Sequence, residues 1–63
     1  MKTTEDIILE NVEKAIKDYN DVPKHTSNKL LYRWYAFGVI SSAFTSLHFP
    51  SHEYYSYLER INI

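Results

Sequence analysis

Apolar residues in the first third of the chain recur with the period of an amphipathic helix. At 100° per residue, one face gathers the apolar side chains Ile8, Leu9, Val12, Ala15, Ile16 and Tyr19. Charged side chains fill the opposite face. The threonines at positions 3–4 precede an acidic first turn, as expected of a helix start. The pattern therefore predicts a helix over residues 4–20.

Two Glu–Lys pairs on the charged face have the favourable i,i+4 order, namely Glu10 with Lys14 and Glu13 with Lys17. Such pairs add a few tenths of a kcal/mol each to helix stability. The helix is expected to end before Pro23, because proline biases the preceding residue away from the helical conformation. A short polar connection then leads to the next apolar segment.

Residues 28–48 predict a long second helix that is apolar over more than half of its circumference. Its large apolar side chains are Leu30, Tyr32, Trp34, Phe37, Val39, Ile40, Phe44 and Leu47. The remaining sector holds the small residues Gly38, Ser41, Ser42, Thr45 and Ser46, whose spacing permits close approach of another helix. A helix of this kind is buried on several sides, so it is either the central helix or a contact with a second subunit.

A third helix is predicted over residues 51–61. Pro50 stops the second helix, and Ser51 is a good N-cap candidate. The apolar side chains of the third segment recur at i, i+3, i+4 and i+7, at Tyr54, Tyr57, Leu58 and Ile61.

These segments predict an all-α fold in a single domain of residues 1–63. The three helices, at about 4–20, 28–48 and 51–61, would form a small bundle or a helical hairpin with a docked C-terminal helix. The alternative is that the aromatic run 32–40 forms a strand. The run 30–49 is long enough to span a bilayer, but Arg33 and His48 make insertion costly, so no membrane contact is expected.

Composition narrows the classes of function. The chain has no cysteine and one glycine, which excludes a disulfide framework, a thiolate zinc site and a glycine-rich phosphate loop. His48 and His52 have the spacing of metal ligands, but Pro50 separates them, so neither a metal nor another cofactor is expected. No nucleophile motif is present, and the chain is expected not to be an enzyme. The acidic residues that follow Met1–Lys2 do not fit a secretion signal, so a cytoplasmic location is expected.

Ten aromatic residues are the clearest functional signal in the chain, and nine of them lie between Tyr32 and Tyr57. A bundle of this size cannot bury so many in its last two helices, and Tyr, Trp and Arg are enriched in protein interfaces. The chain is therefore predicted to be a small protein–protein interaction module. Its expected recognition surface comprises Tyr32, Arg33, Trp34, Tyr35, Tyr54, Tyr55 and Tyr57, with Arg33 as a charged anchor. Helix 28–48 could also join two copies into a homodimer.

Some of these aromatic residues could instead build the core. The candidates with core spacing are Trp34, Phe37, Phe44, Tyr54 and Tyr57. Tyr35 and Tyr55 lie off the main apolar stripes, so both are expected to be exposed.

A nucleic-acid-binding regulator is the alternative function. Lys24, Lys29 and Arg33 lie among aromatic residues in the segment 24–35, as in single-strand binders. Residues 23–63 carry a net charge of +2, against −3 for residues 1–22. The pI near 6.2 argues against this alternative, because nucleic-acid-binding domains are usually strongly basic.

The segments Trp34-Tyr35-Ala36-Phe37-Gly38 and Pro50-Ser51-His52-Glu53-Tyr54-Tyr55 resemble parts of small helical proteins from phages and mobile elements of Gram-positive bacteria. In those proteins an aromatic-rich helix with an Ala-x-Gly step precedes a tight turn and a Glu-Tyr-x-x-Leu helix. The likeness covers roughly half of the chain. It implies a protein that binds a host protein, including a component of a defence system, and blocks or redirects it.

Overall fold

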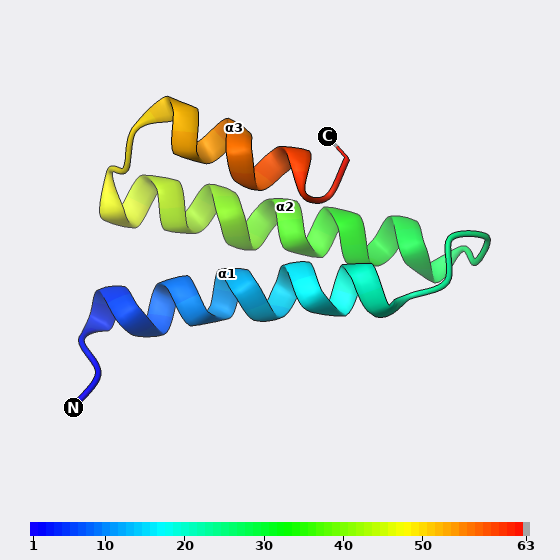
Figure 1. The fold of residues 1–63 in the computed structure, drawn as a ribbon, viewed down its shortest axis with the longest axis horizontal. Coiled ribbons are helices and arrows are strands. Elements are labelled where there is room, and N and C mark those ends of the chain that lie inside the picture. The colour runs from blue at the N-terminus through cyan, green and yellow to red at the C-terminus, as the bar shows by residue number, and fades with distance from the viewer. Residues whose placement is uncertain (63) are drawn as a thin grey trace.

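The computed structural model describes residues 1–62, which form three helices (Figure 1). These are α1 (Thr4–Asp21), α2 (Asn28–Leu47) and α3 (Ser51–Glu59). The predicted all-α fold with three helices is confirmed, and residues 1–62 contain no strand. α2 packs against both α1 and α3, so it is the central helix.

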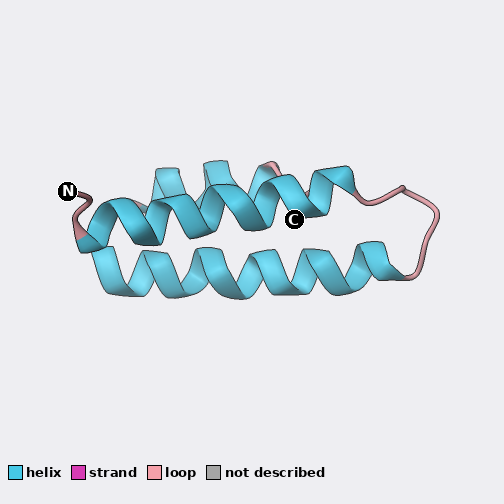
Figure 2. Cartoon of the chain, turned by 90° about the horizontal axis from the view of Figure 1, so that it is seen from below, coloured by secondary structure: helices cyan, strands magenta, loops and turns pink. Residues whose placement is uncertain are grey.

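One side of α2 is left uncovered by the other two helices. In Figure 2, α1 and α3 overlap in projection, and α2 is displaced from both of them. The fold is correspondingly thin, with principal extents of 37 × 26 × 13 Å. The inner face of α2 therefore meets the core, and its outer face meets solvent.

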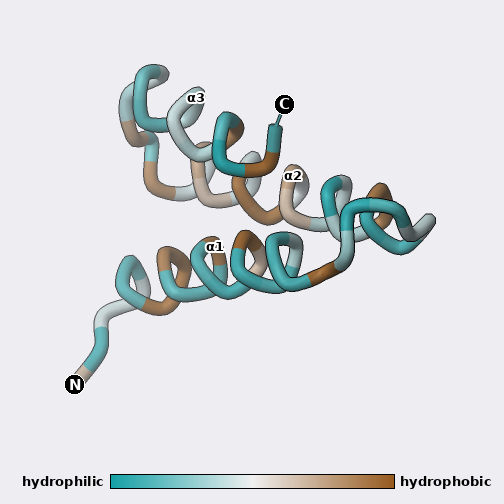
Figure 3. Tube along the Cα trace, turned by 45° about the vertical axis from the view of Figure 1, so that its right-hand side comes forward, coloured by the Kyte–Doolittle hydropathy of each residue, from teal (hydrophilic) through white to brown (hydrophobic). Residues whose placement is uncertain are grey.

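The core lies where the three helices converge, and it is built from nine residues. They are Val12, Ala15, Ile16, Tyr19, Ala36, Ile40, Ala43, Leu58 and Ile61, each at most 6% exposed. Hydrophobic positions recur along α1 between hydrophilic ones, as the predicted amphipathic pattern requires (Figure 3). Full burial of an aliphatic side chain contributes about 1.5–3 kcal/mol, so a core this small leaves little stability to spare.

The ends of α1 and α2 follow from local chemistry. Thr3 Oγ1 accepts a hydrogen bond from the Asp6 backbone N–H at 3.1 Å, and the Asp6 carboxylate accepts one from the Thr3 N–H at 3.1 Å. This capping box starts α1. α2 ends at His48, which adopts a left-handed conformation with φ 53°. Its backbone N–H donates to the Phe44 carbonyl oxygen at 2.9 Å.

α3 is shorter than the sequence predicts. It ends at Glu59, and residues 60–62 form turns in which Asn62 adopts a left-handed conformation. Pro50, not Ser51, is the N-cap residue, and no side chain caps the helix. The turn after Glu59 directs Ile61 back into the core, where it is fully buried.

Candidate functional site

Large apolar side chains gather on the outer face of the first half of α2. Leu31, Trp34 and Tyr35 are 66%, 57% and 59% exposed. Their i, i+3 and i+4 spacing places them side by side on the helix surface. We call these three residues the α2 ridge. Leu30 and Tyr32 flank the ridge and are also exposed.

The ridge is exposed because α2 packs against α1 and α3 through smaller side chains on its opposite face. Ile40 follows Leu31 by nine residues, which places the two side chains on opposite sides of the helix. Ile40 is fully buried, and Ala36 and Ala43 complete the buried face of α2. Trp34 therefore does not belong to the core, which excludes one of the two interpretations of the sequence for this residue.

The outer face of α2 changes character after the ridge. It continues with the small residues Gly38, Ser42 and Ser46, and Ile8 and Asn11 of α1 form a second wall beside them. We call the open groove between these five residues the α1–α2 groove. A Cβ atom added at Gly38 would meet nothing within 4 Å, so the surface above the glycine is open.

Arg33 has an intramolecular role that its sequence neighbours do not indicate. Its Nε donates to the Ile61 carbonyl oxygen at 3.2 Å, and its Nη2 donates to the Asn62 carbonyl oxygen at 3.0 Å. Arg33 thus holds the turn that buries Ile61, and it points away from the ridge residues beside it in sequence. Its guanidinium is engaged with the chain itself, which weakens the prediction that it anchors a partner.

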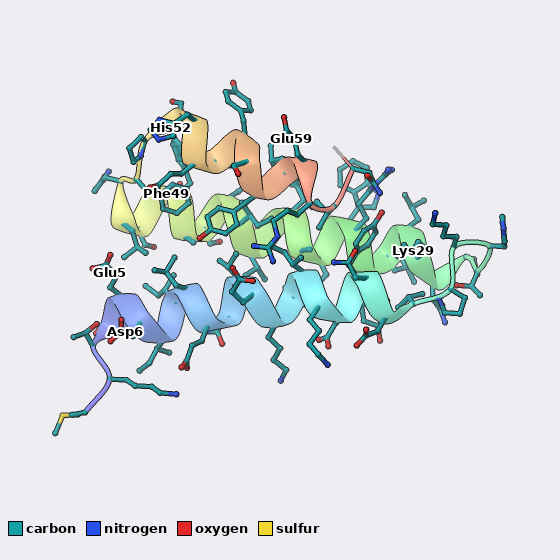
Figure 4. All side chains as sticks on the ribbon, in the orientation of Figure 1. Glu5, Asp6, Lys29, Phe49, His52 and Glu59 are labelled. Atoms are coloured by element: carbon teal, nitrogen blue, oxygen red, sulfur yellow. The ribbon has the colours of Figure 1, made fainter. Side chains whose placement is uncertain are left out.

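Lys29 is likewise engaged within the molecule. Its Nζ donates to the carbonyl oxygens of Tyr19 and Val22 at the end of α1, the latter at 3.1 Å. The same nitrogen lies 3.8 Å from the centroid of the buried Tyr19 ring, at the α1–α2 connection (Figure 4). A cation at a helix C-terminus is favoured by the helix dipole. Lys24, Lys29 and Arg33 line one pocket, where Lys24 is exposed and the other two are partly buried.

The tyrosines of α3 are separate from the ridge. Tyr54 is half-buried, its hydroxyl lies 3.2 Å from Ser41 Oγ, and its ring meets Phe44 at a centroid distance of 4.6 Å. Tyr57 is also half-buried and packs on Phe49 at the α2–α3 connection (Figure 4). Tyr55 is 62% exposed, and with Tyr35 it confirms the exposure predicted for these two residues. Of the predicted recognition residues on α3, Tyr54 and Tyr57 thus pack against α2 and the α2–α3 connection, and Tyr55 is the exposed one.

A bidentate ion pair joins α1 to the turn after α3. Arg60 donates from Nη1 and Nη2 to the two carboxylate oxygens of Glu13, at 2.8 and 2.7 Å. The hydrogen bonds from Arg60 lower the pKa of Glu13, and those to Glu13 raise the pKa of Arg60. Glu13 therefore pairs across the fold rather than with Lys17, which instead meets Asp21 at 3.3 Å.

The part of the chain that the structure describes contains neither a metal site nor a membrane-spanning helix. Among residues 1–62, no three His, Asp or Glu side chains gather closely enough to hold a metal ion. His48 and His52 are exposed on different elements, with His52 in the first turn of α3 (Figure 4). Within the same residues, no helix combines the length and apolar character needed to cross a bilayer.

No family model, curated protein or solved structure matches this chain. The function is therefore inferred from the surface of the molecule. The α2 ridge is its most distinctive feature, because it concentrates three large apolar side chains, each more than half exposed, on one face.

Proposed function

We propose that the chain is a small non-enzymatic interaction module that binds another protein through the α2 ridge. The observation that carries the proposal is the exposure of Leu31, Trp34 and Tyr35 on one face, each more than half accessible. A chain with a core of only nine residues gains stability from every apolar side chain that it buries. Large side chains left outside such a core indicate a surface with a use beyond folding.

The size of the surface supports this proposal. With about 200 Å² for each large side chain, the ridge exposes roughly 350 Å², and Leu30 and Tyr32 extend it to roughly 550 Å². The largest apolar patch on a typical monomer covers about 300–600 Å² and is often functional. The patch is thus at the upper end of that range on a protein of 7.5 kDa. Its tryptophan and tyrosines are the residue types that dominate binding energy in interfaces.

The resemblance to phage and mobile-element proteins supports a host protein as the target, with inhibition or redirection as the outcome. Tyr55 is equally exposed and shares a face of α3 with Glu59, four residues later, which points away from α2 (Figure 4), so it serves as a matched control. We expect immobilised wild type and Tyr55→Glu to capture a protein that the variant Leu31→Glu/Trp34→Glu does not capture. Circular dichroism would verify that all three proteins are folded. Capture of the same proteins by all three would refute the proposal.

Binding of nucleic acid is the second candidate function. The observation in its favour is that Lys24, Lys29 and Arg33 line one pocket. Against it, Lys29 and Arg33 donate to backbone carbonyl oxygens of the chain itself. This function predicts DNA or RNA binding that weakens steeply with salt and with Lys24→Glu. The absence of a gel shift at low salt with both nucleic acids would remove it.

A further inference from the structure

We infer that the protein bound by the α2 ridge is a second copy of the same chain, with the two α2 helices packed antiparallel across Gly38. The inference rests on the proposed function and names the partner of the ridge as the chain itself, in place of the host protein that the resemblance implies. Its basis is that the outer face of α2 is complementary to itself. The first half carries the bulky ridge, and the second half carries the open α1–α2 groove.

An antiparallel pair places each ridge over the small residues in the second half of α2 of the other copy, of which Ser42 also lines the α1–α2 groove. Leu31 lies seven residues before Gly38 and Thr45 seven residues after it, and Trp34 and Ser42 lie four residues to either side. If the helices cross at Gly38, position 31 of one copy meets position 45 of the other, and position 34 meets position 42. A two-fold axis through the crossing point makes both sets of contacts identical, as in the commonest class of protein dimer.

Shape at the crossing point supports the arrangement. Gly38 has open space above it, so no neighbouring atom among residues 1–62 requires the absence of a side chain there. Glycine in a helix interior costs about 1 kcal/mol relative to alanine. Small residues at a crossing allow two helix backbones to approach closely. The glycine and the small residues after it leave room for the ridge of another copy.

The electrostatics of the face also suit a second copy. Arg33 is the one charged residue of α2 between positions 31 and 47, and it points to the C-terminal turn. Two α2 outer faces can therefore meet without burying a like-charged pair. A membrane surface is a poorer match, because the ridge is bordered by Asp18. Two of the three basic side chains beside Leu30, Lys29 and Arg33, donate to backbone carbonyl oxygens of the chain itself.

The buried area is sufficient for a stable dimer. Each copy contributes a ridge of roughly 350 Å² and, because two surfaces in contact bury about equal areas, covers a similar area on the half of α2 that follows Gly38 in the other copy. The sum is roughly 700 Å² per copy, or about 1,400 Å² in total, which is within the range of specific interfaces. A single ridge facing a flat surface would bury about half as much.

Sedimentation equilibrium over a wide concentration range tests the stoichiometry. We expect wild type to reach twice the chain mass of 7.5 kDa. Gly38→Lys places a long cation at the crossing and improves helix propensity, so it should give a folded monomer with a dimer dissociation constant at least 100-fold higher. Tyr55→Lys, on the exposed side of α3, should leave the dimer intact. A monomeric wild type, or a Gly38→Lys protein that still dimerises like wild type, would overturn the inference.

Cysteine cross-linking tests the orientation, because the natural chain contains no cysteine. Gly38→Cys should link the two copies with a short bis-maleimide, since the two positions meet at the two-fold axis. Thr45→Cys should not, because its two copies lie about 20 Å apart in an antiparallel pair. Cross-linking through Thr45→Cys would indicate parallel helices and overturn the arrangement. If wild type is monomeric and captures a different protein through the ridge, the inference that the partner is a second copy is wrong. The proposed function, binding of a protein through the ridge, would then remain supported.

Discussion

Replacing Arg33 by methionine should destabilise the fold without touching the ridge. Methionine retains much of the aliphatic length of arginine but cannot donate to the carbonyl oxygens of Ile61 and Asn62. A hydrogen bond from a charged group contributes about 1.5–3 kcal/mol when shielded from water. One of these two bonds is exposed, so we expect a combined loss of about 1.5–2 kcal/mol. For a chain of this length that loss lowers the melting temperature by about 10 °C.

A double-mutant cycle with Ile61→Ala identifies how Arg33 acts. Ile61 is fully buried, so its truncation alone should cost about 2–5 kcal/mol. If Arg33 stabilises the fold by holding Ile61 in the core, Arg33→Met should cost at least about 0.5 kcal/mol less in the Ile61→Ala background. Measurements in stabilising osmolyte keep the double variant folded. Lys24→Met is the control, because Lys24 is exposed in the same pocket and its loss should change stability by less than about 0.5 kcal/mol.

Thermal and urea unfolding followed by circular dichroism give the required free energies. The reasoning is refuted if Arg33→Met melts within about 2 °C of wild type, or if the two substitutions are additive. The same variant separates folding from recognition. Below its melting temperature, Arg33→Met should self-associate like wild type, because the ridge is intact. If the folded variant fails to associate, Arg33 contributes to binding directly.

Three further substitutions test local features of the fold. His48→Gly should raise the free energy of unfolding by about 0.5–1 kcal/mol, because glycine adopts the left-handed conformation at the end of α2 at lower cost. Urea titration measures this gain, and the control His48→Ala should show none. Glu13→Gln should cost up to about 1 kcal/mol at neutral pH and low salt, because Glu13 is partly exposed in its pair with Arg60. Since the pKa of Glu13 is lowered in the folded state, this contribution is present above the ordinary glutamate range and is lost as the pH falls through the lowered pKa. A wild-type advantage that persists in strong acid would contradict it. Thr3→Ala should cost about 1 kcal/mol through loss of the capping box with Asp6, and an unchanged melting temperature would show that the end of α1 is frayed in solution.

The sequence was sufficient to predict where the helices lie, because helical period and end signals are local. Thr3 and Pro23 are examples, each acting on residues within one turn. It was not sufficient to decide which side of α2 is buried. Apolar residues cover both sides of that helix, and the choice of Ile40 over Trp34 depends on the shape of the two helices that pack on it.

Long-range polar contacts were also beyond sequence reasoning. Glu13 has a lysine at i+4, yet it pairs with Arg60, 47 residues away. Arg33 stands between two aromatic residues, as an interface anchor would, but its acceptors are backbone atoms 28 and 29 residues later. Backbone carbonyl oxygens have no signature in a sequence, so such partners emerge only from the fold.

The neighbour-to-neighbour packing of the helices has a consequence for how the chain folds. α1 packs on α2 and α2 on α3, so most contacts close short loops between adjacent elements. Proteins dominated by such local contacts fold in microseconds to milliseconds. The α1–α2 hairpin can form first, and the ties from Glu13, Tyr19 and Arg33 to residues 60–62 close the longer loops. Substitutions at these ties should therefore accelerate unfolding far more than they slow folding.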